Sequence, residues 1–400
     1  MAKLLEITGK AISGEWGQDD DTGTGIPVLR TTNFTNEGFV NYKNVVTRSI
    51  SKKNIAEKYL RHGDVIIEKS GGSDKQPVGR VIFFEGEENK YLFNNFTGLL
   101  RVQNPEEWLP KYVFYALYAY YRNGGTRAFE NRTTGLHNLQ VDNYVKSVDI
   151  PKLSYRKQQH ICETLDHVRD VVAYREQQLT KLDKLIKARF VEMFGDLVEN
   201  PKQFPCVLLG SIMTVMPQNG LYKPQSAYVQ DKFGTPILRI DGFYNGKVTD
   251  FNNLKRLCCT DFEKERYLLV ENDIVINRVN SIEYLGKCAR ISGLQEDTVF
   301  ESNMMRFHLD DSKVNSTYIT TVLCSQYIYR QILTRAKKAV NQASINQGDV
   351  QSLNVVVPPL SLQNQFADFV AEVDKSKVEV QKALDQTQLL FDSLMQQYFG

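Results

Sequence analysis

The feature of this sequence that most constrains its fold is a phrase that occurs twice. "SVDIPKLSYRKQQHI" (147–161) and "VVPPLSLQNQFADFV" (355–369) both run from β-branched residues through proline and Leu-Ser into a long, glutamine-rich segment. Other blocks recur in the same order: "GIPVLRTTNF" resembles "GTPILRIDGF", with Pro27 and Pro236 209 residues apart, and "VEMFG" resembles "QQYFG", 205 residues apart. Because order and spacing are both kept, the sequence predicts two similar halves.

Each half begins with a mixed part and ends with one long helix. Short β-branched runs such as "DVIIEKS", "VGRVIFFEG" and "DIVINRV" predict strands, and "SGG", "YNGK" and "ENRTTG" predict turns between them. Shorter helices are expected in 110–124 and 315–333. We therefore predict an α+β protein with four segments: mixed α/β domains at 1–150 and 197–355, and helical segments at 151–196 and 356–400.

The two long helical segments carry apolar residues at steps of three and four, or at multiples of seven, which is typical of a coiled-coil seam. Ser154 and Ser361 are placed to cap their first turns, and Gly195 and Gly400 end them. One such helix is unstable alone, so we expect the two to pack antiparallel, in a pseudo-two-fold arrangement of the halves. The alternative is that each helix packs only on its own domain. The predicted seam residues are Ile161, Leu165, Val168, Val172, Leu179, Leu182, Ile186, Phe366, Val373, Val380, Leu384, Phe391 and Leu394. Replacing Leu165 and Leu182 with Asp should loosen the helix pair and its spacing while each isolated mixed domain stays folded.

Composition excludes some classes of protein. The 400 residues are 42% hydrophobic and contain no apolar run long enough for a membrane span. The first residues lack the apolar core of a secretory signal, so a cytoplasmic protein is expected. The six cysteines show no C-x-x-C pair, which favours reduced thiols over a zinc site. A net charge of +2 is mild evidence against a nucleic-acid binder, although a local basic face is compatible with it.

The recurring phrases resemble the specificity (S) subunits of type I restriction–modification enzymes. The resemblance is carried by "IPKLSYRKQQHICETLD", "LIKARFVEMFGD" and "VVPPLSLQNQFADFVAEVD", and it extends over essentially the whole chain. It implies that the two mixed domains are target recognition domains, each of which reads half of a bipartite, asymmetric sequence in double-stranded DNA. It also implies that the helices fix the gap between the halves and dock the methyltransferase (M) subunits, two per complex, and that restriction (R) subunits join them. S-adenosylmethionine, ATP and Mg²⁺ would then be bound by those partners and not by this chain.

No complete catalytic constellation is visible in the sequence, which predicts a non-catalytic protein. There is no G-x-x-x-x-G-K-[ST] phosphate loop, and Pro358-Pro359 is followed by Leu-Ser and not by the aromatic residue of adenine methyltransferases. Asp74, Glu88 and Lys90 could form a nuclease site only if they met in space. Two alternatives stay open: an adaptor that holds two proteins apart without a DNA role, and a duplicated enzyme such as a nuclease.

If the mixed domains read DNA, polar side chains on loops between strands should contact it. In the first half the candidates come from "LRTTNF", "EKSGGSDKQ" and "GGTRAFENRTTGLHNLQ": Arg30, Thr32, Asn33, Lys69, Ser70, Ser73, Lys75, Arg127, Arg132, Thr133, Thr134, His137 and Asn138. In the second half they come from matching blocks: Arg239, Arg278, Asn280, Ser281, Lys337, Lys338, Asn341, Gln342, Ser344 and Asn346. Equivalent loops with different sequences ("NRTTGLHN" against "VNQASINQ") are what two readers of different half-sites require.

Overall fold

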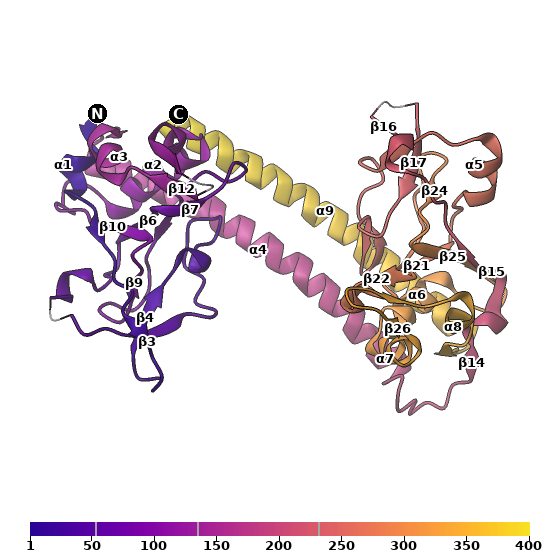
Figure 1. Ribbon diagram of the computed structural model, residues 1–400. Coiled ribbons are helices and arrows are strands. Elements are labelled where there is room, and N and C mark those ends of the chain that lie inside the picture. Colours follow the sequence, from indigo (N-terminus) through magenta and orange to yellow (C-terminus); the bar gives the residue numbers. More distant parts are fainter. Residues whose placement is uncertain (53, 134–135, 231–232) are drawn as a thin grey trace. The chain divides into compact units, whose positions relative to one another are not determined.

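The fold was analysed in a computed structural model, which describes every residue except 53, 134–135 and 231–232, and leaves the side chains of 132–136 undescribed. The chain divides into two compact units (Figure 1). The first comprises Met1–Gln177 and Gln381–Gly400, and the second comprises Gln178–Val380. Each unit therefore contains one mixed domain, the start of the long helix that follows it, and the end of the other long helix.

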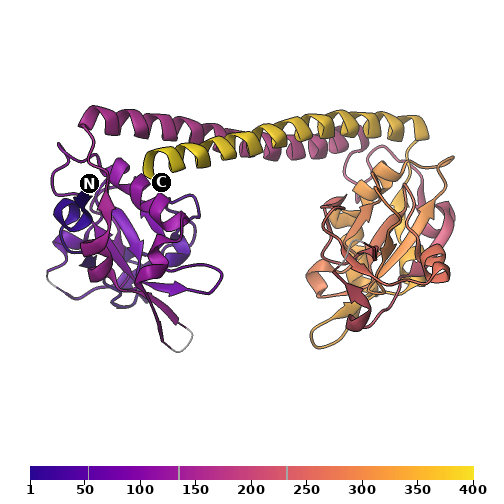
Figure 2. The ribbon, with the colours of Figure 1, turned by 90° about the horizontal axis from the view of Figure 1, so that it is seen from above.

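The two long helices are α4 (Tyr155–Phe194) and α9 (Leu360–Phe399), each of 40 residues and unbroken along its length (Figure 2). At 1.5 Å per residue each is about 60 Å long. Gly195 ends α4 with a φ of 78°, as expected. The predicted cap at Ser361 is wrong, because the carbonyl of Pro359 accepts the first helical hydrogen bonds and α9 starts one residue earlier.

Within each unit the two helices pack on each other as well as on the domain. In the first unit Leu165 and Val168 of α4 share one core with Phe391 and Met395 of α9. In the second unit the rings of Phe190 and Phe194 lie 5.4 and 5.6 Å from that of Phe366. The chain directions are opposed, because Phe366 lies beside Phe190 and Phe194 whereas Lys377, further along α9, pairs with the earlier Asp183. The alternative in which each helix contacts only its own domain is therefore wrong.

The predicted seam residues face these contacts. Ile161, Leu165, Val168, Phe366, Val373 and Phe391 are buried, and the other seven are half-buried. Leu165 has no exposed surface and belongs to the core of the first unit. We therefore now expect Leu165→Asp to destabilise the first unit as a whole, since an unpaired charge would be placed among its core side chains.

The described residues of the first unit form four sheets whose strands come from distant parts of the chain. The strand orders are β2-β10-β6-β8, β3-β5-β4-β9, β11-β12-β7 and the pair β1-β13. Their bounds are β1 Ala2–Lys3, β2 Ile12–Ser13, β3 Gln18–Asp19, β4 Ile26–Leu29, β5 Val46–Ser49, β6 Val65–Glu68, β7 Ser70–Gly72, β8 Val81–Phe83, β9 Leu92–Phe93, β10 Thr97–Leu100, β11 Glu130–Thr133, β12 Leu136–Leu139 and β13 Asp149–Ile150. The helices of this unit besides the long ones are α1 (Leu4–Thr8), α2 (Pro110–Arg122) and α3 (Val141–Ser147).

The second unit repeats this pattern, with strand orders β15-β25-β21-β23-β19-β18, β16-β20-β17-β24, β26-β27-β22 and β14-β28. Strands β18 (Phe243–Tyr244) and β19 (Gly246–Val248) extend its largest sheet. The other strands are β14 Cys206–Leu208, β15 Met213–Asn219, β16 Tyr228–Val229, β17 Thr235–Leu238, β20 Lys255–Leu257, β21 Ile274–Asn277, β22 Val279–Asn280, β23 Cys288–Arg290, β24 Val299–Phe300, β25 Met304–Leu309, β26 Lys337–Lys338, β27 Ala343–Ser344 and β28 Asn354–Val356. Corresponding strands occupy corresponding places in the two units, which confirms the predicted duplication.

The helix expected at 315–333 is two helices, α6 (Ser316–Leu323) and α7 (Gln326–Arg335). The break falls at Cys324 and Ser325, where the hydroxyl of Ser325 accepts a hydrogen bond from the N–H of Ile328 and so caps α7. The remaining helices of this unit are α5 (Asp261–Tyr267) and α8 (Gln347–Gln351).

A buried glutamine joins each long helix to its domain. Gln158 of α4 accepts a hydrogen bond from the N–H of Leu109 at 2.8 Å and donates to the carbonyls of Glu107 and Leu153. Gln363 of α9 accepts from the N–H of Asn315 at 2.8 Å and donates to the carbonyl of Pro358. Leu109 and Asn315 directly precede α2 and α6. Each glutamine therefore fixes the start of a domain helix against the second turn of a long helix.

Candidate functional site

The candidate site of the first unit lies where β6 continues into β7, beside the turn before β10. The backbone N–H groups of Lys69 and Ser70 both donate to the carbonyl oxygen of Phe96, at 2.8 and 3.3 Å. The carbonyl of Lys69 accepts from the N–H of Leu139 in β12 at 2.8 Å. These three bonds hold the β6–β7 connection, the 94–97 turn and the β11–β12 hairpin in one fixed arrangement.

The second unit has the same three bonds at the equivalent positions. The N–H groups of Arg278 and Val279 both donate to the carbonyl of Asn303, at 2.9 and 3.3 Å, and the carbonyl of Arg278 accepts from the N–H of Ile345 at 2.9 Å. We call this set of three bonds the crossing lattice. The backbone is therefore equivalent in the two units while the side chains on it differ, Phe96 in one and Asn303 in the other.

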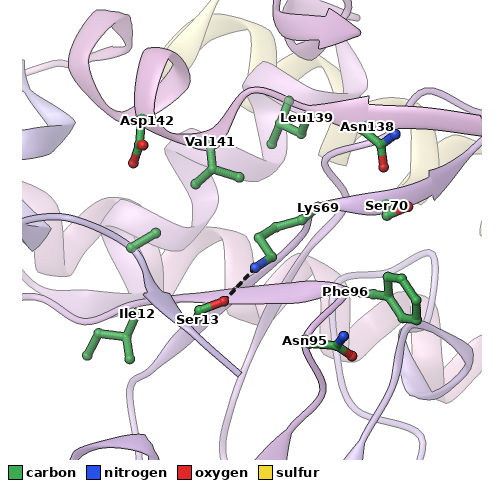
Figure 3. A pocket seen from close by; sticks show the side chains of 11 residues that line it. Ile12, Ser13, Lys69, Ser70, Asn95, Phe96, Asn138, Leu139, Val141 and Asp142 are labelled. Atoms are coloured by element: carbon green, nitrogen blue, oxygen red, sulfur yellow. Dashed lines mark hydrogen bonds between the residues drawn. The ribbon is translucent and has the colours of Figure 1, made fainter. Parts of the chain in front are cut away.

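A cavity of about 500 Å³ opens beside the crossing lattice of the first unit. Figure 3 shows Lys69 reaching across it from the β6–β7 connection, with its ammonium directed at the hydroxyl of Ser13 in β2, 2.8 Å away. Phe96 and Asn95 stand at one side of the cavity, and Asn138 of β12 stands above Ser70. Polar and aromatic groups from four strands or turns thus converge on one hollow.

Lys69 and Arg278 are half-buried cations, and neither forms an ion pair with a described carboxylate. Burial lowers the pKa of Lys69, because the charged ammonium loses hydration that no carboxylate replaces. Arg278 donates to the carbonyl of Ser302 at 3.0 Å, and its buried Nε has no hydrogen-bond partner. Both sites can therefore accept an anion.

The other sequence-predicted residues differ in exposure. The exposed ones are Thr32, Ser73, Lys75, Arg127, Lys337, Lys338, Asn341, Gln342 and Asn346. The half-buried ones are Arg30, Ser70, Asn138, Arg239, Asn280, Ser281 and Ser344. Arg132 and Thr133 lie on β11 with undescribed side chains, and Thr134 lies outside the described residues. The exposed hairpin residues 337–342 and the half-buried pair at the cavity, Ser70 and Asn138, remain available for contact with a ligand.

Three of the sequence-predicted residues have structural roles. Asn33 is 1% exposed, and its amide accepts from the N–H of Arg30 and donates to the carbonyls of Asn41 and Lys43. The ring of His137 is buried between Glu130 and Asp74, at 3.2 and 3.6 Å. Asn346 caps α8 by accepting from the N–H of Asp349. Asn33 and His137 are buried and already bonded within the protein, which argues against DNA contact through them, whereas Asn346 is exposed and only its side-chain oxygen is engaged in the cap.

Arg30 and Arg239 occupy equivalent positions at the ends of β4 and β17, and each has a buried Nε without a hydrogen-bond partner. Arg239 lies 3.7 Å from Asp241 and 3.9 Å from Glu301, and it stacks over Tyr228. Burial raises the pKa of the Glu301 carboxyl despite its bond from the N–H of Ile240. This arrangement is consistent with a structural role for Arg239.

Phe96 and Asn303 are not among the residues predicted from the sequence, because those were polar residues in other loops between strands. Phe96 is 54% exposed although it is a large apolar residue. Aligning "NNFTG" (94–98) with "ESNMM" (301–305) would have placed both residues at the same position of the repeat. That alignment is the feature of the sequence from which the two residues could have been found.

Comparison with known proteins shows what the chain is similar to. Residues 201–387 match the family Methylase_S, described as a type I restriction modification DNA specificity domain. The chain is 24% identical to the EcoKI specificity subunit of Escherichia coli K12, over 94% of this chain and 82% of that protein. Residues 201–387 thus match the type I specificity family, and the chain as a whole is similar to specificity subunits of that family. The putative MjaX specificity subunit of Methanocaldococcus jannaschii is 30% identical over 48% of this chain, and this match spans less than half of that subunit, 44%.

Solved specificity subunits share the fold of this chain. The crystal structure of the S subunit from M. genitalium covers all of this chain and 95% of its own, with a TM-score of 0.57 and 15% identity. A structure from a study of type I restriction–modification complex assembly and conformational transition gives the same TM-score at 16% identity. The family that the recurring phrases resemble is the one matched by residues 201–387, and the α+β fold with a long helix pair is confirmed.

The candidates for catalysis are not brought together. Asp74 lies beside His137, whereas Glu88 accepts from the N–H of His62 and Lys90 pairs with Glu87. Among the described residues, no group of three or more His, Cys, Asp or Glu side chains could share a metal ion. None of the helices in the described part of the chain has the length and apolarity needed to cross a bilayer.

Proposed function

We propose that this chain selects the DNA sequence on which a type I restriction–modification complex acts. Each unit reads one half of a bipartite, asymmetric site in double-stranded DNA, and the two halves differ in sequence. The observation that carries this proposal is the crossing lattice, in which the same backbone bonds present Lys69 and Phe96 in one unit and Arg278 and Asn303 in the other. A duplicated scaffold with unlike side chains suits two readers of unlike half-sites.

The chain acts without chemistry of its own in this proposal. Two methyltransferase subunits dock on the α4–α9 pair and supply S-adenosylmethionine, and restriction subunits supply ATP- and Mg²⁺-dependent steps. Apolar side chains left exposed on the helices, such as Leu185 at 46%, Val378 at 64% and Leu389 at 69%, support a partner on that surface. The complex works in the cytoplasm, where its DNA is found.

Mapping N6-methyladenine across the genome of the source organism tests this function. Deleting the gene should abolish methylation at one bipartite motif, and restoring it on a plasmid should return the same motif. An unchanged methylation map after deletion would refute the proposal. It would favour an adaptor without a DNA role, which fluorescence anisotropy with mixed duplexes at low salt would then test separately.

A further inference from the structure

We propose that in each unit the crossing lattice holds a cation that binds a DNA phosphate next to a side chain that reads a base. The pairs are Lys69 with Phe96 in the first unit and Arg278 with Asn303 in the second. This inference rests on the proposed function and assigns separate roles to residues of the same site: the cation fixes the register of the unit on the duplex, and its neighbour distinguishes the bases.

The two cations have what a phosphate site requires. They occupy the same lattice position, 209 residues apart, and both keep a positive charge there despite being different residues. Among the described residues, Asp142 is the one acid that lines the cavity beside Lys69, and it forms no ion pair with the ammonium. Figure 3 shows Asp142 on the far rim, on α3, while the ammonium is bonded to Ser13. An anionic ligand stabilises a half-buried cation that lacks a counter-ion more than one that is already paired with a carboxylate.

Phe96 and Asn303 occupy the same position in equivalent turns of the two units. The N–H of Thr97 donates to the carbonyl of Asn94 at 3.1 Å, and the N–H of Met304 donates to that of Glu301 at 3.1 Å. Thr97 and Asn94, at the two ends of the first turn, are buried, at 0% and 4% exposed, and hold the turn in the domain. Phe96 and Asn303 are the third residues of these turns, and their carbonyls are held by the crossing lattice. A fixed backbone with a free side chain places a base-reading group at low entropic cost.

The chemistry of the readers predicts different base preferences. An exposed phenylalanine contacts the C5-methyl of thymine, whereas an asparagine forms a bidentate pair with the N6 and N7 of adenine. Phosphate contacts carry no direct sequence information. Changing a reader should therefore alter the recognised sequence in one half-site, and changing a cation should weaken binding to every sequence.

The cations are tested with Lys69→Gln and Arg278→Gln in the complex purified through a tag on this chain. Each variant should methylate the unchanged motif, and the slope of log affinity against log salt should become shallower by about 0.9 for one lost phosphate contact. Lys43→Gln and Arg330→Gln are the matched controls, since each removes an exposed charge from the same unit outside the site. A changed base preference in either cation variant, or a slope equal to that of its control, would overturn the phosphate assignment.

The readers are tested with Phe96→Asn and Asn303→Phe, which exchange the two side chains on an equivalent backbone. Methylation mapping should show a changed base at one position of one half-site for Phe96→Asn, and at one position of the other half-site for Asn303→Phe. Thermal melting of each variant separates lost recognition from lost folding. A folded variant that methylates the wild-type motif to the wild-type extent would overturn its reading role.

The outcomes also separate this inference from the proposed function. If the wild-type chain specifies a bipartite motif and the four variants do not behave as described, the function stands and the assignment of roles is wrong. If deletion of the wild-type gene leaves the methylation map unchanged, the function itself is wrong.

Discussion

Gln158 is expected to hold the first long helix on its domain, and Gln158→Ala tests this. The side chain is 1% exposed and makes three hydrogen bonds to main-chain groups, with lengths of 2.8 to 3.0 Å. Its removal takes these bonds from the N–H of Leu109 and from the carbonyls of Glu107 and Leu153, at three part-buried positions. At about 1 kcal/mol for each unsatisfied group, the loss in the free energy of unfolding is about 3 kcal/mol.

Urea denaturation followed by tryptophan fluorescence measures this loss where it occurs. Both tryptophans of the chain, Trp16 and Trp108, lie in the first unit, and Trp108 directly precedes Leu109. With a denaturant slope of about 2 kcal/mol per molar, the unfolding midpoint should fall by about 1.5 M. Gln159→Ala, one residue along on the exposed face of α4, is the control. A midpoint for Gln158→Ala equal to that of the control would refute the idea that this amide joins helix to domain.

Three further predictions concern the helix pair and the site. Leu165→Asp should unfold the first unit, because it buries a charge in a core where Leu165 has no exposed surface; the half-buried Leu182→Asp should be tolerated better, as thermal melts of both variants will show. Arg132→Ala should change discrimination within one half-site by about 1–3 kcal/mol in competition binding, and equal binding to all variants of that half-site would contradict it. Because burial lowers the pKa of Lys69 and phosphate binding needs its proton, DNA affinity should fall at a lower alkaline pH in the wild type than in Lys69→Arg; identical pH profiles would count against the phosphate contact.

The architecture could be predicted well because a repeated phrase and a helical periodicity can both be seen directly in the sequence. The repeated phrase located the entrances to α4 and α9, and the seam spacing selected side chains of which none is exposed. The start of α9 and the break between α6 and α7 were not predicted, because each depends on which residue accepts the first hydrogen bonds of a helix. Pro359 displaces Ser361 as the cap of α9, and Ser325 divides the predicted helix at 315–333 into two.

The site was harder to predict because the sequence does not say which polar groups are already bonded. Asn33 and Asn138 look alike as candidates, yet Asn33 is saturated by main-chain bonds and Asn138 lines a cavity. The crossing lattice joins residues 27 and 70 positions apart in the sequence, Lys69 to Phe96 and Lys69 to Leu139. Such contacts depend on the register of the strands in the sheets. Aligning the two halves of the sequence shows which residues are equivalent but not which strands pair.

Photo-crosslinking from positions 96 and 303 tests the central claim most directly. A photoreactive phenylalanine analogue replaces Phe96 in one protein and Asn303 in another, and the crosslinked bases are mapped in the assembled complex on its own target duplex. Attachment within one half of the target from position 96, and within the opposite half from position 303, is the result that two separate readers require. Attachment of both positions to the same half, or of neither to DNA, would contradict the account.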